Sequence, residues 1–452
     1  MKIFQVPFCF QPDRVGGTET YVATLAADLI QLGVDVVIAA PGRENQSYEI
    51  DGLCVRRFAT SDTVSDLAEL YGGGDEYAAR NFASILDEEK PDIVHLHAFT
   101  HAVSVRLIDA CHARKIPVIF TYHTPTVSCQ RGTMMLWGET PCDGELDATR
   151  CASCTLQGLG LDRSLSRLVS RLPPALQGWM AEKKLQGGLW TAARMGELVQ
   201  RRHEAVRQLL SRADHIVAVC QWAREVLLTN GTPAAKVSLC THGINWPEDI
   251  SPVVWPAESR ASDTVKIAFV GRIDINKGIH VLIDALRLLP EQRVTLDIFG
   301  SPQSDANLAY RDDLVRRATG DSRISFKGSL PSHEVMHRLK GYDFLAVPSQ
   351  WMETGPLVIL EAFAAGIPII GSRLGGVANL VQDEVNGLLV EPWEAMRWRD
   401  AFLRIATDPA IRKKLRTGVS PPRRSRDVAY DMLALYSRHI GTPKTRVAAL
   451  NA

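Results

Sequence analysis

Two stretches of the chain alternate short apolar segments with segments of helical periodicity, and this alternation restricts the fold more than any other feature. Residues 1–123 contain four apolar segments of strand length, "KIFQV", "VDVVIAA", "PDIVHLH" and "IPVIFTYH". Six more follow residue 264, from "VKIAFVG" to "GLLVEP". Such alternation predicts parallel sheets with helices on both faces. We therefore expect an α/β protein with two Rossmann-like domains.

The alternation also predicts the domain boundaries. An N-terminal domain is expected at 1–245. It is interrupted by an insertion at about 124–212 that lacks strand patterns and consists of a cysteine-containing loop, 124–156, followed by a long helical stretch. Residues 246–264 hold three prolines and no periodicity, which is typical of a linker. A C-terminal domain is expected at 265–420, and a last helix lies within 425–452.

Charge balance and cysteine count restrict the class of protein. Lys and Arg number 51, as do Asp and Glu, so the chain lacks the basic excess of nucleic-acid-binding proteins. No apolar run approaches the roughly 18 residues that a membrane span needs. The N-terminal "MKIFQVPFCFQPD" is too quickly polar for a signal peptide and is interpreted as a first strand. With nine scattered cysteines and no export signal, we expect a reducing, cytoplasmic environment.

The loop after the first strand of the second stretch carries two cations. In "FVGRIDINKG", Gly271 follows the strand, Arg272 comes next, and Lys277 precedes a helix that begins near Gly278. In open parallel sheets, ligands bind at the carboxyl ends of the strands. A guanidinium fork, an ammonium group and a helix N-terminus could together neutralise a diphosphate. The alternative is a solvated surface loop, and this motif alone does not decide between the two.

Two glutamates follow a later strand at unusual positions. In "WMETGPLVILEAFAAG", Glu353 lies in a polar loop before Gly355, and Glu361 lies inside an apolar run. Pro356 suits the start of a helix, which places Glu361 on its second turn. Because burying an unpaired carboxylate is unfavourable, these residues favour a ligand with an anionic centre and hydroxylated ends, such as a sugar nucleotide. A surface carboxylate with a structural partner is the alternative for Glu361.

The N-terminal domain offers its own candidates at strand ends. Gly16 and Gly17 follow the first strand and precede a helix, and His123 ends a later strand. A lone strand-end histidine is more often a hydrogen-bonded structural residue than a ligand-binding one. His95 and His97 are expected to point to opposite faces of their strand, and we do not interpret them as a metal pair.

Taken together, these motifs resemble those of the retaining glycosyltransferases of family 4, which have the GT-B fold. The resemblance is strongest over about 265–395, moderate over 1–123 and absent from about 124–210. One departure is Asn379 in "GGVANL", where family members often carry a glutamate. The matching positions are the E-x7-E pair Glu353 and Glu361, Arg272 with Lys277, Gly16 with Gly17, and His123.

The resemblance implies a role for each matching residue. It implies that the two domains face each other across a cleft, that the first binds the acceptor and the second the donor, and that the final helix returns to the first. Arg272 and Lys277 would bind the donor diphosphate, and Glu361 would bind the ribose hydroxyls. Glu353 and His123 would contact the transferred sugar and are the catalytic candidates. The implied donor-binding set is Gly16, Gly17, Arg272, Lys277, Glu353, Thr354, Gly355, Pro356, Leu357 and Glu361.

The expected activity is therefore that of a retaining glycosyltransferase, with a UDP- or GDP-sugar as donor and a saccharide or lipid-linked hydroxyl as acceptor. Such a reaction would serve polysaccharide, glycolipid or other glycoconjugate synthesis, and no cofactor or divalent metal is implied for catalysis. Two alternatives stay open. A GT-B nucleotide-sugar epimerase would convert the donor alone, and a non-catalytic sugar-nucleotide-binding scaffold would not even hydrolyse the donor slowly.

Four cysteines within the insertion indicate a metal site. Cys129, Cys142, Cys151 and Cys154 lie within 26 residues, and the last two have the C-x2-C spacing that lets two thiolates chelate one ion. Four thiolates favour zinc, and the same ligands can hold an iron–sulfur cluster. The alternative is four reduced thiols or a Cys151–Cys154 redox pair. We expect a structural zinc ion that braces the loop after His123.

The helical part of the insertion has a basic bias. Over 160–212, ten Lys or Arg residues stand against four Asp or Glu, with Leu and Trp residues between them. Basic faces beside Leu and Trp suit an anionic bilayer surface, whereas a solvated helical hairpin fits equally well. Peripheral contact with the inner face of the cell membrane is thus one of two expectations.

Overall fold

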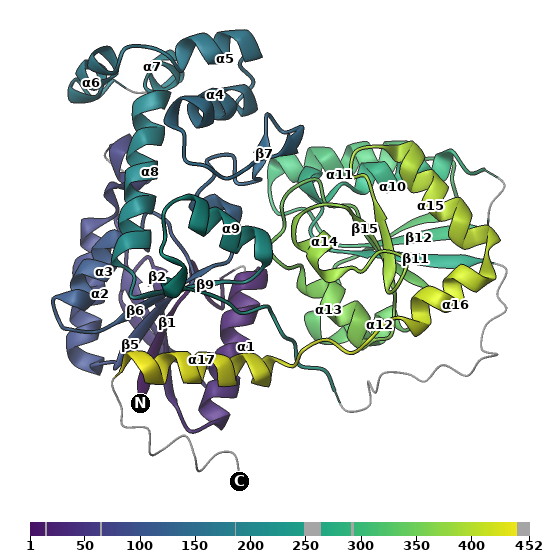
Figure 1. Cartoon of the computed structure of the whole chain (residues 1–452), viewed down its shortest axis with the longest axis horizontal. Coiled ribbons are helices and arrows are strands. Elements are labelled where there is room, and N and C mark those ends of the chain that lie inside the picture. Colours follow the sequence, from purple (N-terminus) through teal and green to yellow (C-terminus); the bar gives the residue numbers. More distant parts are fainter. Residues whose placement is uncertain (14–15, 64–65, 186, 248–263, 291–292, 441–452) are drawn as a thin grey trace. The chain divides into compact units, whose positions relative to one another are not determined.

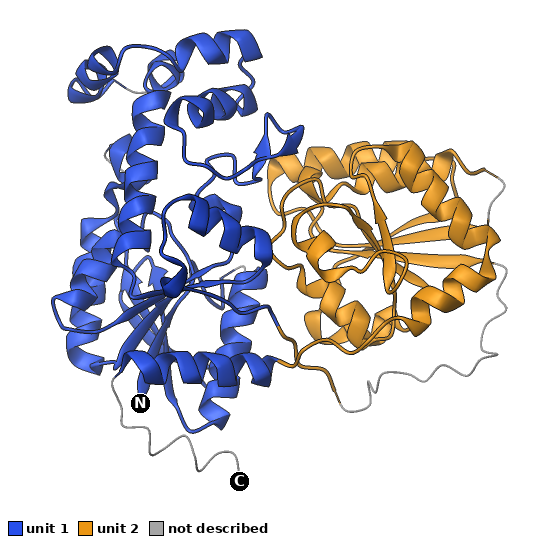
Figure 2. Ribbon diagram, in the orientation of Figure 1, with its two compact units in different colours: residues 1–242, 425–452 blue, residues 243–424 orange. Residues whose placement is uncertain are grey.

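The computed structural model describes residues 1–13, 16–63, 66–185, 187–247, 264–290 and 293–440 (Figure 1). The chain divides into two compact units, coloured separately in Figure 2. Unit 1 comprises residues 1–242 and 425–452, and unit 2 comprises residues 243–424. Of the linker expected at 246–264, residues 248–263 lie outside the described residues.

An eight-stranded sheet forms the centre of unit 1, in the order β10-β9-β6-β5-β1-β2-β4-β3. Neighbouring strands pair in parallel, except that β3 runs antiparallel to β4 at one edge. The strands are β1 (Lys2–Val6), β2 (Asp35–Gly42), β3 (Gln46–Ile50), β4 (Leu53–Ala59), β5 (Ile93–Leu96), β6 (Val118–Tyr122), β9 (His215–Ala218) and β10 (Val237–Leu239). The helices packed with this sheet are α1 (Gly17–Gln31), α2 (Glu76–Glu89), α3 (Val105–His112), α9 (Gln221–Thr229) and α17 (Ser425–His439).

The C-terminal helix α17 completes the core of unit 1. Its apolar face, which includes Val428, Met432 and Tyr436, is buried in one cluster with residues of α1 and of the central strands, such as Leu25 and Ile3. At the start of α17, the Ser425 hydroxyl bonds to the Asp28 carboxylate on α1. The last helix is therefore part of the same core as the first strand.

In its described residues, the insertion of unit 1 contains a two-stranded hairpin and five α-helices. They are β7 (Met135–Leu136), β8 (Thr140–Pro141), α4 (Ala148–Gly158), α5 (Arg163–Val169), α6 (Pro174–Glu182), α7 (Gly188–Ala193) and α8 (Met195–Arg212). Figure 1 shows α5, α6 and α7 at the end of α8 that lies away from the sheet. The expectation of a loop over 124–156 is wrong for its last part. There the Asp147 carboxylate accepts a hydrogen bond from Arg150 N at 2.7 Å and starts a helix.

A six-stranded, fully parallel sheet forms the centre of unit 2, in the order β13-β12-β11-β14-β15-β16. The strands are β11 (Val265–Val270), β12 (Val294–Phe299), β13 (Ile324–Gly328), β14 (Phe344–Val347), β15 (Ile369–Ser372) and β16 (Gly387–Val390). The helices are α10 (Ile279–Arg287), α11 (Asp305–Ala318), α12 (Val335–Leu339), α13 (Leu357–Ala364), α14 (Gly375–Leu380), α15 (Ala395–Thr407) and α16 (Pro409–Thr417). The prediction of two α/β domains built on parallel sheets is confirmed.

Candidate active site

The loop between β11 and α10 holds Lys277 in place. Its short 3₁₀ turn, Ile275–Lys277, begins where the Asp274 carboxylate accepts a hydrogen bond from Asn276 N at 2.9 Å. Gly278 follows with φ +70°, and a Cβ there would collide with the Pro348 carbonyl, so only glycine fits. Gln350 N also donates to Asn276 O at 2.7 Å. The loop is thereby attached to the segment that follows β14.

That segment brings Glu353 against Lys277. Lys277 Nζ lies 2.7 Å from Glu353 Oε1, and the Ser349 hydroxyl donates to the same oxygen. Burial alone would raise the pKa of Glu353, but the Lys277 charge and these hydrogen bonds outweigh it, so the pKa lies below its ordinary value. Lys277 Nζ also lies 5.7 Å from the centre of the Trp351 ring. Two of the predicted donor-binding residues therefore form one ion pair around a buried carboxylate, and Arg272, which lies in the same loop as Lys277, is exposed.

Helix α13 presents its N-terminus next to this pair. Pro356 occupies the N-cap position and the helix begins at Leu357, so Thr354 and Gly355 lie in the approach to it. Glu361 lies on the second turn, where the sequence placed it. Burial raises the pKa of Glu361 to about 7. The carboxyl is therefore balanced between its neutral and charged forms near neutral pH, and a hydroxyl donor would favour the charged form.

The glycine pair of "GGVANL" packs against the backbone of Glu353. Gly376 N donates to Glu353 O at 2.5 Å, and a Cβ on Gly376 would lie 2.6 Å from that oxygen. Gly375 adopts φ +51° at the start of α14. Glycine at 376 therefore permits a backbone approach that a side chain would block. The sequence gave no sign of Ser349, whose only signal is a hydroxyl just beyond the end of β14.

In unit 1, His123 is buried where β6 ends, among aromatic rings. The Tyr21 ring, from the second turn of α1, lies edge-on to it with 4.8 Å between ring centroids. The His242 ring stacks on it at 5.8 Å and 17°. Gly16 caps α1, and its N–H donates to the Glu19 carboxylate at 2.8 Å. The α1 N-terminus with Gly16 and Gly17 and the strand-end His123 thus lie at the same edge of the unit 1 sheet.

A chain of hydrogen bonds leads from His123 to the C-terminal helix. His123 Nε2 lies 2.9 Å from His97 Nδ1, and His97 Nε2 lies 2.6 Å from Gln5 Oε1. Gln5 Nε2 donates to Tyr436 Oη at 3.1 Å, and that hydroxyl lies 2.6 Å from His95 Nδ1. This series of hydrogen bonds joins β6, β5, β1 and α17, and all of its side chains are buried.

These hydrogen bonds fix which ring nitrogen of His123 carries a proton. Because Gln5 Oε1 can only accept, His97 carries its proton on Nε2, and its Nδ1 accepts from His123 Nε2–H. Burial holds the pKa of both His97 and His123 well below the ordinary histidine value, so both rings are neutral at pH 7.

The expectation that His95 and His97 face opposite sides of their strand is wrong. Their ring centroids lie 4.0 Å apart. Residues two apart on a strand share a face, because side chains alternate with a period of two.

Two cavities of several hundred Å³ lie apart from the candidate site residues described above. One of about 600 Å³ in unit 1 lies among the loops that follow β1, β2, β4 and β5, and its lining includes Arg43, Glu44, Thr60, Ser61 and His101. Buried Arg57 holds its rim, because it pairs with Asp13 at 2.9 Å and donates to the carbonyls of Phe10 and Pro41. Sequence reasoning missed this cavity.

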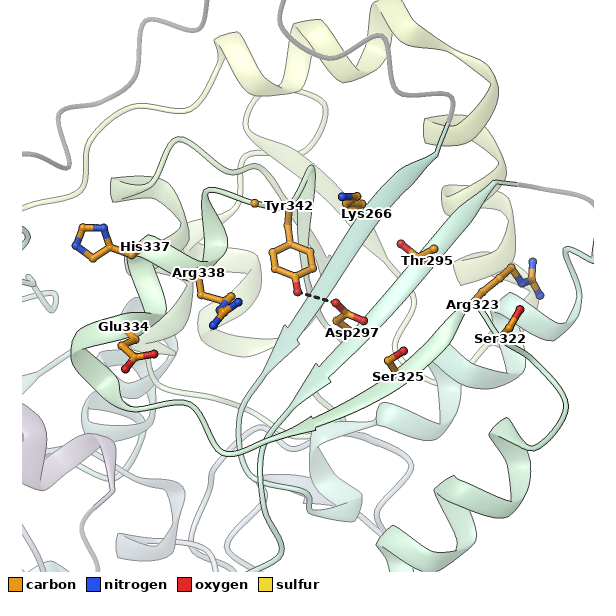
Figure 3. A pocket seen from close by; sticks show the side chains of 11 residues that line it. Lys266, Thr295, Asp297, Ser322, Arg323, Ser325, Glu334, His337, Arg338 and Tyr342 are labelled. Atoms are coloured by element: carbon orange, nitrogen blue, oxygen red, sulfur yellow. Dashed lines mark hydrogen bonds between the residues drawn. The ribbon is translucent and has the colours of Figure 1, made fainter.

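The other cavity, of about 550 Å³, lies in unit 2 (Figure 3). Lys266, Thr295 and Ser325, each the second residue of its strand, line it, so it lies toward the starts of β11–β13. The donor motifs instead follow the strand ends. Some of its polar groups pair within the protein: Tyr342 Oη donates to Asp297 at 2.7 Å, and Arg323 binds Asp321. We assign no role to it.

The four cysteines of the insertion line one small cavity, and all are reduced. Burial, followed by the neighbouring cysteines, raises the pKa of Cys151 to about 12. Trp137 N donates to Cys154 Sγ at 3.2 Å. Within the described part of the chain, no three His, Cys, Asp or Glu side chains stand in an arrangement that could hold a metal ion. Cys129, Cys142, Cys151 and Cys154 are thus not arranged as a metal site in this structure, and a structural zinc ion bound by them stays an untested prediction.

Comparison with known families covers both units. The family described as "Glycosyl transferase 4-like domain" matches residues 16–241, which is half of the chain, and "Glycosyl transferases group 1" matches residues 255–419. The chain belongs to the group 1, family-4-like glycosyltransferases. The resemblance seen in its motifs is thereby confirmed.

Known glycosyltransferases match the chain to different extents. The D-inositol 3-phosphate glycosyltransferase of Kribbella flavida is 31% identical over 221 residues, which are 46% of this chain and 52% of that protein. An uncharacterized glycosyltransferase of Methanocaldococcus jannaschii is 25% identical over 404 residues, 87% of this chain and 85% of that protein. The chain spans about half the length of the D-inositol 3-phosphate glycosyltransferases that it matches.

Solved glycosyltransferase structures match along nearly the whole chain. Sucrose-phosphate synthase from Thermosynechococcus elongatus has a TM-score of 0.65 at 19% identity and covers 98% of this chain and 100% of its own. Anabaena HepE, solved in complex with UDP and glucose, has a TM-score of 0.62 at 17% identity, with 97% and 99% covered. At these identities the likeness shows a shared fold, which is GT-B as predicted.

Proposed function

We propose that this chain is a retaining glycosyltransferase that moves a sugar from a nucleotide-diphosphate sugar, a UDP- or GDP-sugar, to a hydroxyl of a saccharide or lipid-linked acceptor. The observation that carries the proposal is the buried Lys277–Glu353 pair, held at 2.7 Å beside the N-terminus of α13. A cation, a carboxylate and a helix N-terminus in one place fit a ligand that is anionic in one part and hydroxylated in the next. HepE, a relative of the same fold, was solved with UDP and glucose.

The positive groups of unit 2 act on the diphosphate. Arg272 and Lys277 bind its oxygens, and the N–H groups at the start of α13 add the partial positive charge of a helix end. These groups stabilise the leaving diphosphate as its charge grows, which is the main demand of the reaction. Since Lys277 has three N–H donors, it can hold a phosphate oxygen while it keeps Glu353. This set supplies the neutralising charge without a divalent metal.

The two glutamates bind hydroxyls on either side of the diphosphate. Glu353 is ionised and faces the transferred sugar together with the backbone of Thr354 and Gly355. Glu361 accepts the ribose hydroxyls, and their donation stabilises its charged form, which burial alone disfavours near pH 7. Glu361 is therefore expected to lose its proton when the donor binds.

Unit 1 provides the acceptor side. His123 is neutral and held by His97, so it positions hydroxyls by hydrogen bonding and does not act as a charged acid. The 600 Å³ cavity of unit 1, with its threonine, serine, arginine and glutamate lining, suits a hydroxylated acceptor. The acceptor hydroxyl attacks on the face that the diphosphate leaves, and the departing phosphate takes its proton, which gives retention at the anomeric carbon.

A panel of nucleotide sugars tests the proposal. Protein in excess EDTA is incubated with UDP- and GDP-sugars, binding is followed by the rise in melting temperature, and transfer to saccharide acceptors is followed by mass spectrometry. We expect one donor to stabilise the protein and to yield a glycosylated acceptor with the donor's anomeric configuration. Conversion of the donor to an isomeric nucleotide sugar without acceptor would identify an epimerase. Binding without any turnover would identify a scaffold.

A further inference from the structure

Exposed apolar side chains gather on the three short helices at the end of α8. Seven of the 21 large apolar side chains exposed in the described part of the chain lie within residues 159–190, which we call the tip. Leu189 is 87% exposed and Leu168 is 68% exposed. The seven are Leu159, Leu165, Leu168, Leu176, Trp179, Leu189 and Trp190. A concentration of this kind marks an interaction site, because scattered single residues are the norm on a soluble surface.

The packing of α6 shows why its apolar residues stay outside. Gln177 and Met180 form its buried face, and Gln177 Oε1 accepts a hydrogen bond from Glu197 N on α8 at 2.7 Å. Leu176 and Trp179, three residues apart on the same helix, remain exposed. The helix is therefore already anchored through its polar and Met face, and its Leu–Trp face has no role in that anchoring.

The tip also carries a net positive charge. Its sequence contains five Lys or Arg residues and two Asp or Glu residues. Arg163 and Arg167 lie over the Trp137 ring, at 4.6 and 5.4 Å from its centre. Arg171, Lys183 and Lys184 are exposed and flank the ends of α5 and α6. Cations next to exposed Leu and Trp are complementary to a surface that is negatively charged outside and apolar beneath.

We propose that the tip adsorbs to the surface of an anionic phospholipid bilayer. Short helices with Leu and Trp beside Lys and Arg lie in the interface between headgroups and acyl chains. Among the described residues, no helix is both long and apolar enough to cross a membrane. α5, α6 and α7 have seven, nine and six residues, so this contact is peripheral. Lipid phosphates pair with the basic residues, and the Leu and Trp side chains enter the layer below them.

Co-sedimentation of the full chain with vesicles tests this inference. We expect binding to phosphatidylglycerol–phosphatidylcholine vesicles, weak binding to pure phosphatidylcholine, and release at high salt, where charges are screened over about 3 Å. The variant Leu168→Gln/Trp179→Gln/Leu189→Gln should bind at least tenfold more weakly. Each basic residue near an anionic surface strengthens binding roughly fivefold, so Arg171→Gln/Lys183→Gln/Lys184→Gln should lose about a hundredfold at low salt.

A matched control variant distinguishes binding through the tip from nonspecific hydrophobic adsorption to vesicles. Leu308→Gln/Met396→Gln removes exposed apolar side chains from α11 and α15 of unit 2 and should bind vesicles like the wild type. Melting curves of every variant verify that it folds. Equal binding to both kinds of vesicle, or no loss in the tip variants, would overturn the inference. So would a dimer seen by light scattering that the Leu–Trp variant abolishes, because the tip would then be a self-association surface. No donor is present, so failure here leaves the proposed transfer reaction untouched.

Discussion

Replacement of Lys277 by methionine removes the charge that holds Glu353 while keeping most of the side-chain volume. In the wild type, Lys277 Nζ lies 2.7 Å from a carboxylate whose side chain is 8% exposed, whereas the lysine side chain is 18% exposed. Lys277 and Ser349 both donate to Glu353 in the wild type, and after the change the Ser349 hydroxyl still does so. The Lys277→Met variant therefore contains a buried carboxylate without its counter-charge.

The structure gives the size of the expected loss. Breaking a buried ion pair by removing one partner costs about 3–5 kcal/mol. Because water reaches the lysine and Ser349 still donates, we expect about 2–3 kcal/mol here, which lowers the melting temperature of a domain of this size by roughly 5–10 °C. Donor affinity should also fall at least tenfold, because Lys277 loses a charge-assisted contact worth about 1.5–3 kcal/mol.

The dependence on pH distinguishes this cause from a general packing defect. In the wild type, the depressed pKa of Glu353 contributes stability that is present above the unfolded value of 4.5 and lost as the pH falls through the folded value. In Lys277→Met, the hydrogen bond from Ser349 still opposes the effect of burial but the Lys277 charge no longer does, so we expect the pKa of Glu353 to rise above 4.5. The stability deficit should therefore be largest at pH 8 and should shrink toward pH 5.

Melting curves from pH 5 to 8 and donor titrations check these expectations. The double variant Lys277→Met/Glu353→Gln, which has no buried charge, should recover most of the stability but none of the activity. If Lys277→Met proved as stable as the wild type at pH 8, or if its deficit did not depend on pH, the reasoning about this buried pair would be refuted.

Three further predictions concern other parts of the site. Glu361→Gln should stabilise the protein at pH 8, and this advantage should disappear as the pH falls below about 7, because the wild-type carboxyl then takes up its proton. The variant should also bind the donor about tenfold more weakly. Melting curves and donor titrations above and below pH 7 check this, and a variant less stable than the wild type at pH 8 contradicts it. His97→Leu removes the acceptor for His123 Nε2–H and should lower kcat about tenfold with donor affinity unchanged. Tyr436→Phe should mainly lower the free energy of unfolding, by about 1–3 kcal/mol. Enzyme kinetics and denaturant melts check this, and equal kcat losses in both variants would show that His97 acts only through stability. Purified protein should contain close to one zinc per chain by elemental analysis. Cys151→Ser/Cys154→Ser should lose the zinc and expose the loop to protease, while donor binding survives. Metal-free, fully active protein with four titrating thiols would contradict the prediction of a zinc site.

The features that the sequence predicts correctly are those encoded locally. Strand and helix alternation follows from residue periodicity, and the positions of Lys277, Glu353 and Glu361 follow from the glycine and proline residues around them. Each of these signals lies within a single strand, helix or loop, and the fold needs only their order along the chain.

The features that the sequence did not reveal depend on distant contacts or on a misread pattern. The bond between Gln5 and Tyr436 joins residues 431 positions apart, and no local pattern indicates it. The unit 1 cavity is lined from four separate loops. The position of His95 beside His97 was readable from the two-residue period of a strand and was misjudged. The helix that carries Cys151 was missed because the capping residue Asp147 was overlooked.

We propose that the strand ends of unit 2 bind a nucleotide diphosphate through Arg272 and Lys277 without a metal ion. Titration calorimetry with UDP and GDP, in excess EDTA and in excess Mg²⁺, tests it most directly, with Arg311→Ala on α11 as a matched control. We expect one nucleotide to bind equally well in both buffers. Arg272→Ala should bind it at least tenfold more weakly, while Arg311→Ala should bind it like the wild type. Binding that requires Mg²⁺, or an Arg272→Ala variant with wild-type affinity, would contradict it.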